Sequence, residues 1–423
     1  MINANNPSLT SWIDVPASSD FPIQNIPFGI AHSNGQFFAA TIIGEQVISL
    51  AALHQNGFFL EVKLPAGVFE KEYLNDFIAL GKPVWRAVRE RISELFRKDN
   101  AELSDNVEAR EKCLLHVNSV EMCLPVKIGD YTDFYSSKEH ATNVGSMFRD
   151  PKNALLPNWL HLPVAYHGRA SSVIISDTNF HRPKGQLMPP NAEKPVYGPS
   201  KAMDFELETA FIIGKPTKLG HSIGTKEAYE YIFGMLLFND WSARDIQRWE
   251  YVPLGPFLAK NFASTVSPWL VTMDALEPFM VPAPSQDPSV LSYLERGNDK
   301  TAVDINLEVW LQPEKQRETK ICTSNFKYMY WSMDQQLAHH TVNGCNMNVG
   351  DMLASGTISG PTPDSYGSML EITWNGSKPL ELEGGLQRKF LEDGDTVIIR
   401  GYAQKGNVRI GFGEAKAKVL PAV

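Results

Sequence analysis

Short apolar runs rich in strand-forming residues open the chain, and polar and glycine turns separate them. They cover residues 28–31, 37–43 and 46–50. Clusters of β-branched and aromatic residues bounded by turn formers are typical of β-strands. This pattern predicts a small N-terminal β-domain.

A helical spacing follows these runs. Pro83 suits the first turn of a helix. Apolar residues then recur mostly three or four positions apart among charges, at Val84, Ala87, Val88, Ile92 and Leu95. That spacing gathers apolar side chains on one face of a helix.

The next change of pattern marks a domain boundary. The polar, acid-rich stretch over residues 98–112 reads as a connection, and residues 114–126 are strand-like again. We therefore expect an N-terminal domain with a helical connection over residues 1–120 and a larger domain over residues 121–423.

Prolines and glycines are frequent beyond the boundary, which predicts long loops between strands. Helices are expected at residues 226–232, 241–249 and 333–340. Strands are expected at residues 368–374, 396–402 and 408–412. The predicted fold class is mainly β (α+β).

Composition and charge narrow the classes of function. The chain is 43% hydrophobic and 21% charged, with a formal net charge of −9. An acidic chain without a basic block is a poor binder of nucleic acid, although a metal and one or two arginines can still attract a small anion. We expect no membrane helix, because no apolar run approaches roughly 18 residues, and no secretory signal.

The cysteines, Cys113, Cys123, Cys322 and Cys345, contain no CxxC pair. Four in so long a chain do not make a disulfide framework. Buried reduced thiols in a cytoplasmic protein are the expectation.

Acidic residues precede one strongly apolar run. Asp204, Glu206 and Glu208 lead into residues 210–213. Alternate residues on a strand share a face, so the two glutamates project together. One interpretation is a half-exposed strand with its acids in water. The other is a carboxylate cluster at the edge of a core, which needs a cation.

A second polar pattern follows the apolar run that ends at Asp240, where a helix is expected to begin. Asp240 has the residue type of an N-cap. However, Asp240, Arg244, Gln247 and Tyr251 are spaced by four, three and four residues, which places them on one face of a continuing helix. Such a stripe suits a polar pocket.

Further candidates lie in segments rich in turn formers. His140 closes such a segment at residues 129–140, and a lone histidine is more often structural than catalytic. Arg149 and residues 162–169 are expected in loops, where functional residues concentrate. Glycines around Ser355 and Thr357 let the backbone approach a ligand closely.

Glu371 is the one acid in the strand expected at residues 368–374, so it must be paired, exposed or functional. His339 and His340 are not expected to chelate a metal together, because adjacent helical residues do not face one another. The chain has no GxGxxG, Walker, HExxH or GxSxG motif, so nicotinamide, nucleotide, zinc-protease and serine-hydrolase interpretations lack their signatures.

Taken together and in order, several strings resemble the fumarylacetoacetase family. They are residues 128–135, 140–145, 155–159, 239–247, 251–258 and 353–360. The resemblance covers roughly residues 20–421 and is densest from residue 126 onward. It implies a small SH3-like N-terminal barrel, a larger β-roll domain and a homodimer.

The resemblance also implies site residues. The family's metal carboxylates fall on Asp133, Glu206, Glu208 and Asp240, an all-oxygen set that suits Mg²⁺ or Ca²⁺. A second metal-linked position falls on Lys260 and Ser264. There the family pattern has Gly then Thr, whereas this chain has Ala263 and Ser264.

The implied general base is His140, oriented by Glu371. The implied stabilisers of negative charge are Arg244, Gln247 and Lys260. The implied substrate contacts are Tyr135, Arg149, Tyr166, Gln247, Tyr251 and Thr357.

By resemblance, the expected reaction is metal-dependent hydrolysis of a carbon–carbon bond in a small diketo acid, giving fumarate and acetoacetate at the end of tyrosine and phenylalanine catabolism. One alternative is a decarboxylase, hydratase or isomerase of oxo acids with the same metal carboxylates. The joint presence of His140, Glu371, Arg244 and Gln247 favours a hydrolase. The other alternative is a non-catalytic protein of the same fold, which loss of a metal carboxylate would have favoured.

Overall fold

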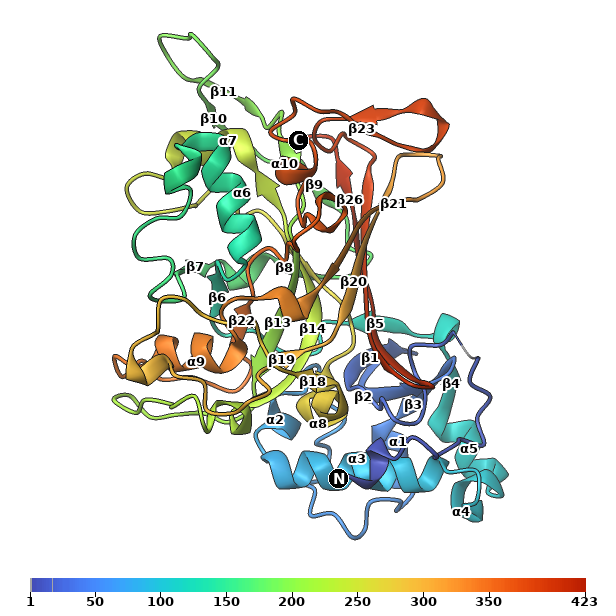
Figure 1. The fold of residues 1–423 in the computed structure, drawn as a ribbon. Coiled ribbons are helices and arrows are strands. Elements are labelled where there is room, and N and C mark those ends of the chain that lie inside the picture. Colours follow the sequence, from blue (N-terminus) through green and yellow to red (C-terminus); the bar gives the residue numbers. More distant parts are fainter. Residues whose placement is uncertain (1, 17) are drawn as a thin grey trace.

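The computed structural model describes residues 2–16 and 18–423. Its N-terminal part contains a five-stranded antiparallel sheet in the order β4–β3–β2–β1–β5 (Figure 1). The strands are β1 (Gly29–Ser33), β2 (Gln36–Ile43), β3 (Gln46–Ser49), β4 (Leu114–His116) and β5 (Glu121–Cys123). The strands predicted between residues 28 and 50 are confirmed, and β5 carries this sheet to Cys123.

Helices pack beside this sheet. They are α1 (Leu50–Gln55), α2 (Asn75–Ile78), α3 (Lys82–Phe96), α4 (Ala101–Ser104) and α5 (Val107–Cys113). The helix predicted after Pro83 is confirmed as α3, which buries Val88, Ile92 and Leu95 in the N-terminal core.

The connection expected over residues 98–112 is formed by two short helices, α4 and α5. The side chains of Asn100 and Asn106 accept hydrogen bonds from the first turns of these helices. Such capping stabilises short helices in a polar sequence.

The larger part is built on two sheets. The first has the order β7–β6–β22–β13–β14–β16–β8, with β17 also paired to β14. Its strands are β6 (Tyr131–Phe134), β7 (Ala165–Gly168), β8 (Val173–Ile175), β13 (Leu207–Ile213), β14 (Ile232–Asp240), β16 (Ser264–Val266), β17 (Val271–Thr272) and β22 (Met352–Ala354).

The second sheet has the order β21–β20–β25–β26–β9. Its strands are β9 (Phe180–His181), β20 (Asn306–Gln312), β21 (Thr319–Asn325), β25 (Thr396–Lys405) and β26 (Val408–Leu420). Leu207, Leu237, Leu307 and Ile399 belong to one buried apolar cluster that joins the two sheets. The long β25–β26 hairpin reaches the N-terminal part (Figure 1), where Arg409 Nε lies 2.8 Å from Asp20 Oδ1.

Shorter elements complete the larger part. The helices are α6 (Lys138–Phe148), α7 (Arg244–Glu250), α8 (Met273–Leu276), α9 (Met333–Thr341) and α10 (Met369–Ile372). The short strands are β10 (Lys184–Leu187), β11 (Val196–Pro199), β12 (Met203–Asp204), β15 (Ser242–Ala243), β18 (Met280–Val281), β19 (Ala302–Val303), β23 (Leu380–Glu381) and β24 (Gln387–Arg388). The mainly β fold class and the helix predicted at residues 333–340 are confirmed.

Three local predictions in this part are wrong. Residues 226–232 hold only a 3₁₀ turn at Ala228–Glu230, because Ile232 already begins the fully buried β14. Residues 368–374 contain α10 in place of a strand, with Ser368 as its N-cap. Residues 162–169 include strand β7. Among the described residues, no helix is long and apolar enough to cross a membrane.

Candidate active site

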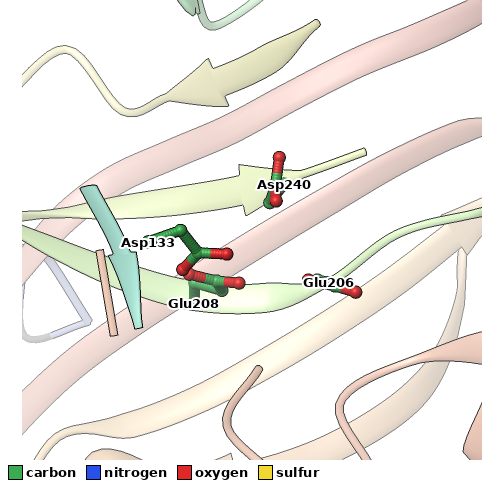
Figure 2. Close-up of side chains that lie close together, drawn as sticks. All are labelled: Asp133, Glu206, Glu208 and Asp240. Atoms are coloured by element: carbon green, nitrogen blue, oxygen red, sulfur yellow. The ribbon is translucent and has the colours of Figure 1, made fainter. Parts of the chain in front are cut away.

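Four buried carboxylates meet at the ends of three interior strands of the large sheet. Each of Asp133, Glu206, Glu208 and Asp240 offers an oxygen within 4.8 Å of the others. Figure 2 shows the carboxylates of Asp133 and Glu208 side by side, with Asp240 and Glu206 both on the right of this pair. The interpretation of a half-exposed strand with solvated acids is therefore wrong.

Strand register brings these acids together. β13 runs antiparallel to β14 with Leu207 opposite Asn239, so the start of one strand lies beside the end of the other. β22 lies between β13 and β6, and its Ala354 pairs with Ala210 on one side and with Asp133 on the other. The acids therefore come from three strand ends that are distant in sequence.

Two buried cations contact the cluster. Lys260 Nζ lies 2.7 Å from Glu206 Oε2 and 2.8 Å from Asp240 Oδ2. An Arg244 guanidinium nitrogen lies 2.7 Å from Glu206 Oε1. Burial alone would raise the pKa of Glu206, but Lys260 and Arg244 hold that pKa below its ordinary value.

Burial of Asp133 and Glu208 is not compensated in this way. Burial and the neighbouring Asp240 raise the pKa of Asp133 well above its ordinary value. Burial and Asp133 do the same to the pKa of Glu208. Asp133 Oδ1 and Glu208 Oε1 are buried without a hydrogen-bond partner. Buried carboxylate oxygens need a partner, and hard divalent cations prefer such oxygens. The cluster therefore fits a metal ion.

Further groups converge on Asp240. Ser264 Oγ donates to Asp240 Oδ1 at 3.0 Å, and the Tyr166 hydroxyl donates to Asp240 Oδ2 at 3.0 Å. Asp240 ends β14, and the N-cap of α7 is Ala243. The N-cap interpretation and the helical stripe that included Asp240 are therefore both wrong.

A buried histidine–carboxylate pair is the second feature. His140 Nδ1 lies 2.6 Å from Glu371 Oε2, and both side chains are buried. Burial would raise the pKa of Glu371, but His140 and the hydrogen-bond donors around the carboxylate lower it overall. When the Nδ1–H group donates to the Glu371 carboxylate, Nε2 is the ring nitrogen that carries no proton. Glu371 is therefore paired and not exposed.

Three polar side chains fix Glu371 further, and the sequence reasoning missed them. Ser359 Oγ and Ser368 Oγ each donate to Oε2 at 2.9 Å, and Asn143 Nδ2 donates to Oε1 at 2.9 Å. Two signals were present in the sequence. Asn143 lies three residues after His140 on a helix, and Ser368 precedes Glu371 by the spacing of a capping box.

The remaining candidate residues form two groups, one buried or in contact with residues of the site and one farther out. Arg244 donates to Gln247 Oε1 at 3.2 Å, and the ring centroids of Tyr135 and His140 are 5.3 Å apart. Thr357 is buried on the segment after β22. The structure does not bring Tyr251 or Arg149 to the acids.

Those two residues lie farther out. Tyr251 is 51% exposed. Arg149 is exposed and donates to the Ala154 carbonyl. His339 and His340 have separate partners, Tyr293 and Thr132, so they do not converge on a shared ligand position.

Known proteins resemble the chain along almost its whole length. A family model described as fumarylacetoacetate hydrolase C-terminal matches residues 130–420, and one described as fumarylacetoacetase N-terminal matches residues 24–125. The chain is 53% identical to a fumarylacetoacetase of Homo sapiens, covering 98% of this chain and 99% of the relative. It is 52% identical to one of Dictyostelium discoideum, covering 98% of each.

A solved fumarylacetoacetate hydrolase from Exiguobacterium antarcticum matches the fold. Its TM-score is 0.52 at 16% identity, and the match covers 94% of this chain and 99% of that one. At that identity the likeness concerns the fold alone.

Proposed function

The chain belongs to the fumarylacetoacetate hydrolase family, and from that membership we propose that it hydrolyses a carbon–carbon bond of 4-fumarylacetoacetate. The products are fumarate and acetoacetate, and the reaction is the last step of tyrosine and phenylalanine catabolism. The observation that carries this proposal is the buried His140–Glu371 pair near the acid cluster. Glu206 forms a backbone bridge with Ser368, whose hydroxyl donates to Glu371 at 2.9 Å, so the pair lies beside the cluster.

The metal is proposed to be Mg²⁺ or Ca²⁺, held by Asp133, Glu206, Glu208 and Asp240, because both ions prefer an all-oxygen set. A bound ion supplies Lewis-acid polarisation of the substrate's oxygens. Asp240 and Ser264 supply oxygens at the proposed second cation position. Lys260 is an ammonium with no lone pair, and its pKa is raised because Asp240 and Glu206 outweigh burial. Its part there is therefore that of a hydrogen-bond donor.

His140 acts as the base in the proposed hydrolysis. Its Nε2 takes a proton from water while Glu371 holds the ring in the required tautomer. The hydroxide adds to the ketone carbon of the fumaryl group, and the bond from that carbon to the neighbouring CH₂ breaks. The CH₂ carbon keeps the electron pair and receives the proton from His140. This returns His140 to its neutral form.

The tetrahedral oxygen formed by water addition needs donors. Arg244, Gln247 and Lys260 are the proposed ones, and one terminal guanidinium nitrogen of Arg244 is buried without a partner. Such donors are worth about 10²–10³ in rate each. Tyr135, Tyr166 and Thr357 are proposed to contact substrate inside the site. Arg149 and Tyr251 are proposed to bind it from the more exposed rim.

The proposal also covers the domains, the oligomeric state and the cellular location. The division into residues 1–120 and 121–423 is proposed to separate an SH3-like barrel from a β-roll domain, and the five-stranded antiparallel sheet of the first part supports it. Two copies are proposed to form a homodimer. A cytoplasmic location is proposed because all four cysteines are free thiols, as expected in a reducing compartment.

The test follows both products. The purified chain is incubated with 4-fumarylacetoacetate, and fumarate and acetoacetate are quantified against time. Equal release of the two supports the proposal. Isomerisation, or loss of carbon dioxide without fumarate, contradicts it. His140→Asn should abolish turnover while leaving cation binding intact, and a variant with near-normal kcat would show that His140 is not the base.

A further inference from the structure

Asp204 is a buried carboxylate outside the acid cluster, and the mechanism above does not use it. It ends β12, which pairs with β15 so that Asp204 lies opposite Ser242. Its side chain is fully buried. Its oxygens bind groups on two different segments of the site, so Asp204 is placed between two parts of the catalytic machinery.

The first segment is the start of α7. Asp204 Oδ2 accepts a hydrogen bond from Arg244 Nε at 2.8 Å. The backbone supports this contact, because the Arg244 amide donates to the Ala202 carbonyl at 2.9 Å. The terminal nitrogens of Arg244 remain for Glu206, Gln247 and the substrate.

The second segment is α10, the short helix that carries Glu371. Asp204 Oδ1 accepts from the Met369 amide at 2.6 Å, and Oδ2 accepts from the Leu370 amide at 3.0 Å. Ser368 Oγ accepts from the Glu371 amide in the same first turn. Asp204 and Ser368 together therefore satisfy the amides that start this helix.

We propose that Asp204 is a positioning residue that fixes the Arg244 guanidinium relative to the His140–Glu371 pair; this inference rests on the proposed function. One carboxylate binds the charge-stabilising arginine on one side and the helix of the base-orienting glutamate on the other. Water activation and oxyanion stabilisation must act on the same carbonyl. A misplacement of about 1 Å between such groups costs about 10²-fold in rate.

Asp204→Asn tests the proposal, because both oxygens of Asp204 accept hydrogen bonds and the NH₂ group of an asparagine cannot. The variant must therefore lose a contact either to the arginine or to the amides of α10. We expect kcat to fall about 10²-fold, while KM and divalent-cation affinity stay within about threefold. Asp395→Asn is the matched control. Asp395 is also buried and accepts from a guanidinium, that of Arg388, and from one backbone amide, that of Glu392.

The control separates positioning from stability. Asp395→Asn should lower the melting temperature and keep kcat within about threefold. Unchanged kcat in Asp204→Asn overturns the proposal. A loss of kcat in both variants that follows their loss of melting temperature also overturns it. If Asp204→Asn does not fold, Asp204→Glu keeps the charge but lengthens the link, and wild-type kcat in that variant overturns the proposal.

A second readout does not depend on the substrate. The His140 Nδ1 proton that bonds Glu371 is followed as a downfield proton resonance, assigned by its loss in His140→Asn. It should shift or broaden in Asp204→Asn and stay unchanged in Asp395→Asn; an unchanged signal in Asp204→Asn overturns the proposal. A wild-type chain that releases no fumarate contradicts the proposed function alone, and the resonance still decides the role of Asp204.

Discussion

Replacing Glu371 with glutamine perturbs the proposed base without changing the size of the side chain. The carboxylate accepts hydrogen bonds from His140, Ser359, Ser368 and Asn143. All of these partners donate to the carboxylate, so the amide nitrogen of a glutamine faces a donor wherever it lies. Glu371→Gln must therefore reorient the histidine, turn a serine hydroxyl or the Asn143 amide so that it accepts, or lose a contact.

The size of the effect follows from where that nitrogen lies. If it faces His140, the ring must reverse its tautomer and Nε2 no longer accepts a proton; a comparable change in another histidine–carboxylate pair costs about 10⁴ in kcat. If it faces Asn143, the tautomer survives and only the negative charge is lost, for which we expect about 10²-fold. The predicted loss of kcat is therefore about 10²–10⁴-fold, or roughly 3–5 kcal/mol of barrier.

The assay is steady-state release of fumarate, with thermal unfolding to verify the fold. KM and divalent-cation affinity should stay within about threefold, because Glu371 lies outside the acid cluster. Asn143→Ala is the matched control, since it removes one neutral donor worth about 1 kcal/mol and keeps the charge. A folded Glu371→Gln variant with more than about a third of wild-type kcat would refute the reasoning.

Three further predictions concern the buried charges and thiols. Glu208→Gln should raise the melting temperature of the metal-free chain, because it removes a buried negative charge whose Oε1 has no hydrogen-bond partner. The variant should lose the increase in melting temperature that a divalent cation gives the wild type; a lower metal-free melting temperature would contradict this. Burial lowers the pKa of His340 from 6.5, so His340 takes up a proton more readily in the unfolded chain than in the folded one. The free energy of unfolding should therefore fall as the pH drops from about 7.5 to about 5.5. His340→Gln should flatten that fall, and an equal slope would show that another group causes it. Burial raises the pKa of the Cys113 thiol to about 11, so at about pH 8 a thiol reagent should modify the partly exposed Cys345 well before Cys113, as read by mass spectrometry of digested protein.

The local sequence pattern was sufficient to predict a helix or strand where one hydrophobic periodicity dominated the segment. The runs at residues 37–43 and 46–50 alternate with clear turns, and α3 has both a proline start and an apolar face. The failure at residues 368–374 arose from competing signals. Met369, Leu370 and Ile372 suggest a strand, whereas Ser368 and Glu371 have the spacing that caps a helix, and the cap decided the outcome.

The site depended on long-range contacts that local pattern does not encode. The alternation of side chains along a strand predicted that Glu206 and Glu208 share one face. The sequence around Asp133 does not indicate that only β22 separates β6 from β13 in the sheet. That neighbourhood came from the family resemblance. The position of Asp204 was missed for the same reason, since its partners Arg244 and Met369 are distant in the chain.

A single divalent ion among the four acids is the central proposal, and one titration tests it directly. The chain is stripped with a chelator, and kcat for fumarate release is measured as Mg²⁺ or Ca²⁺ is added back. We predict that turnover vanishes in the stripped protein and returns with the binding of the ion. Full turnover by protein shown to contain no divalent metal would contradict the account.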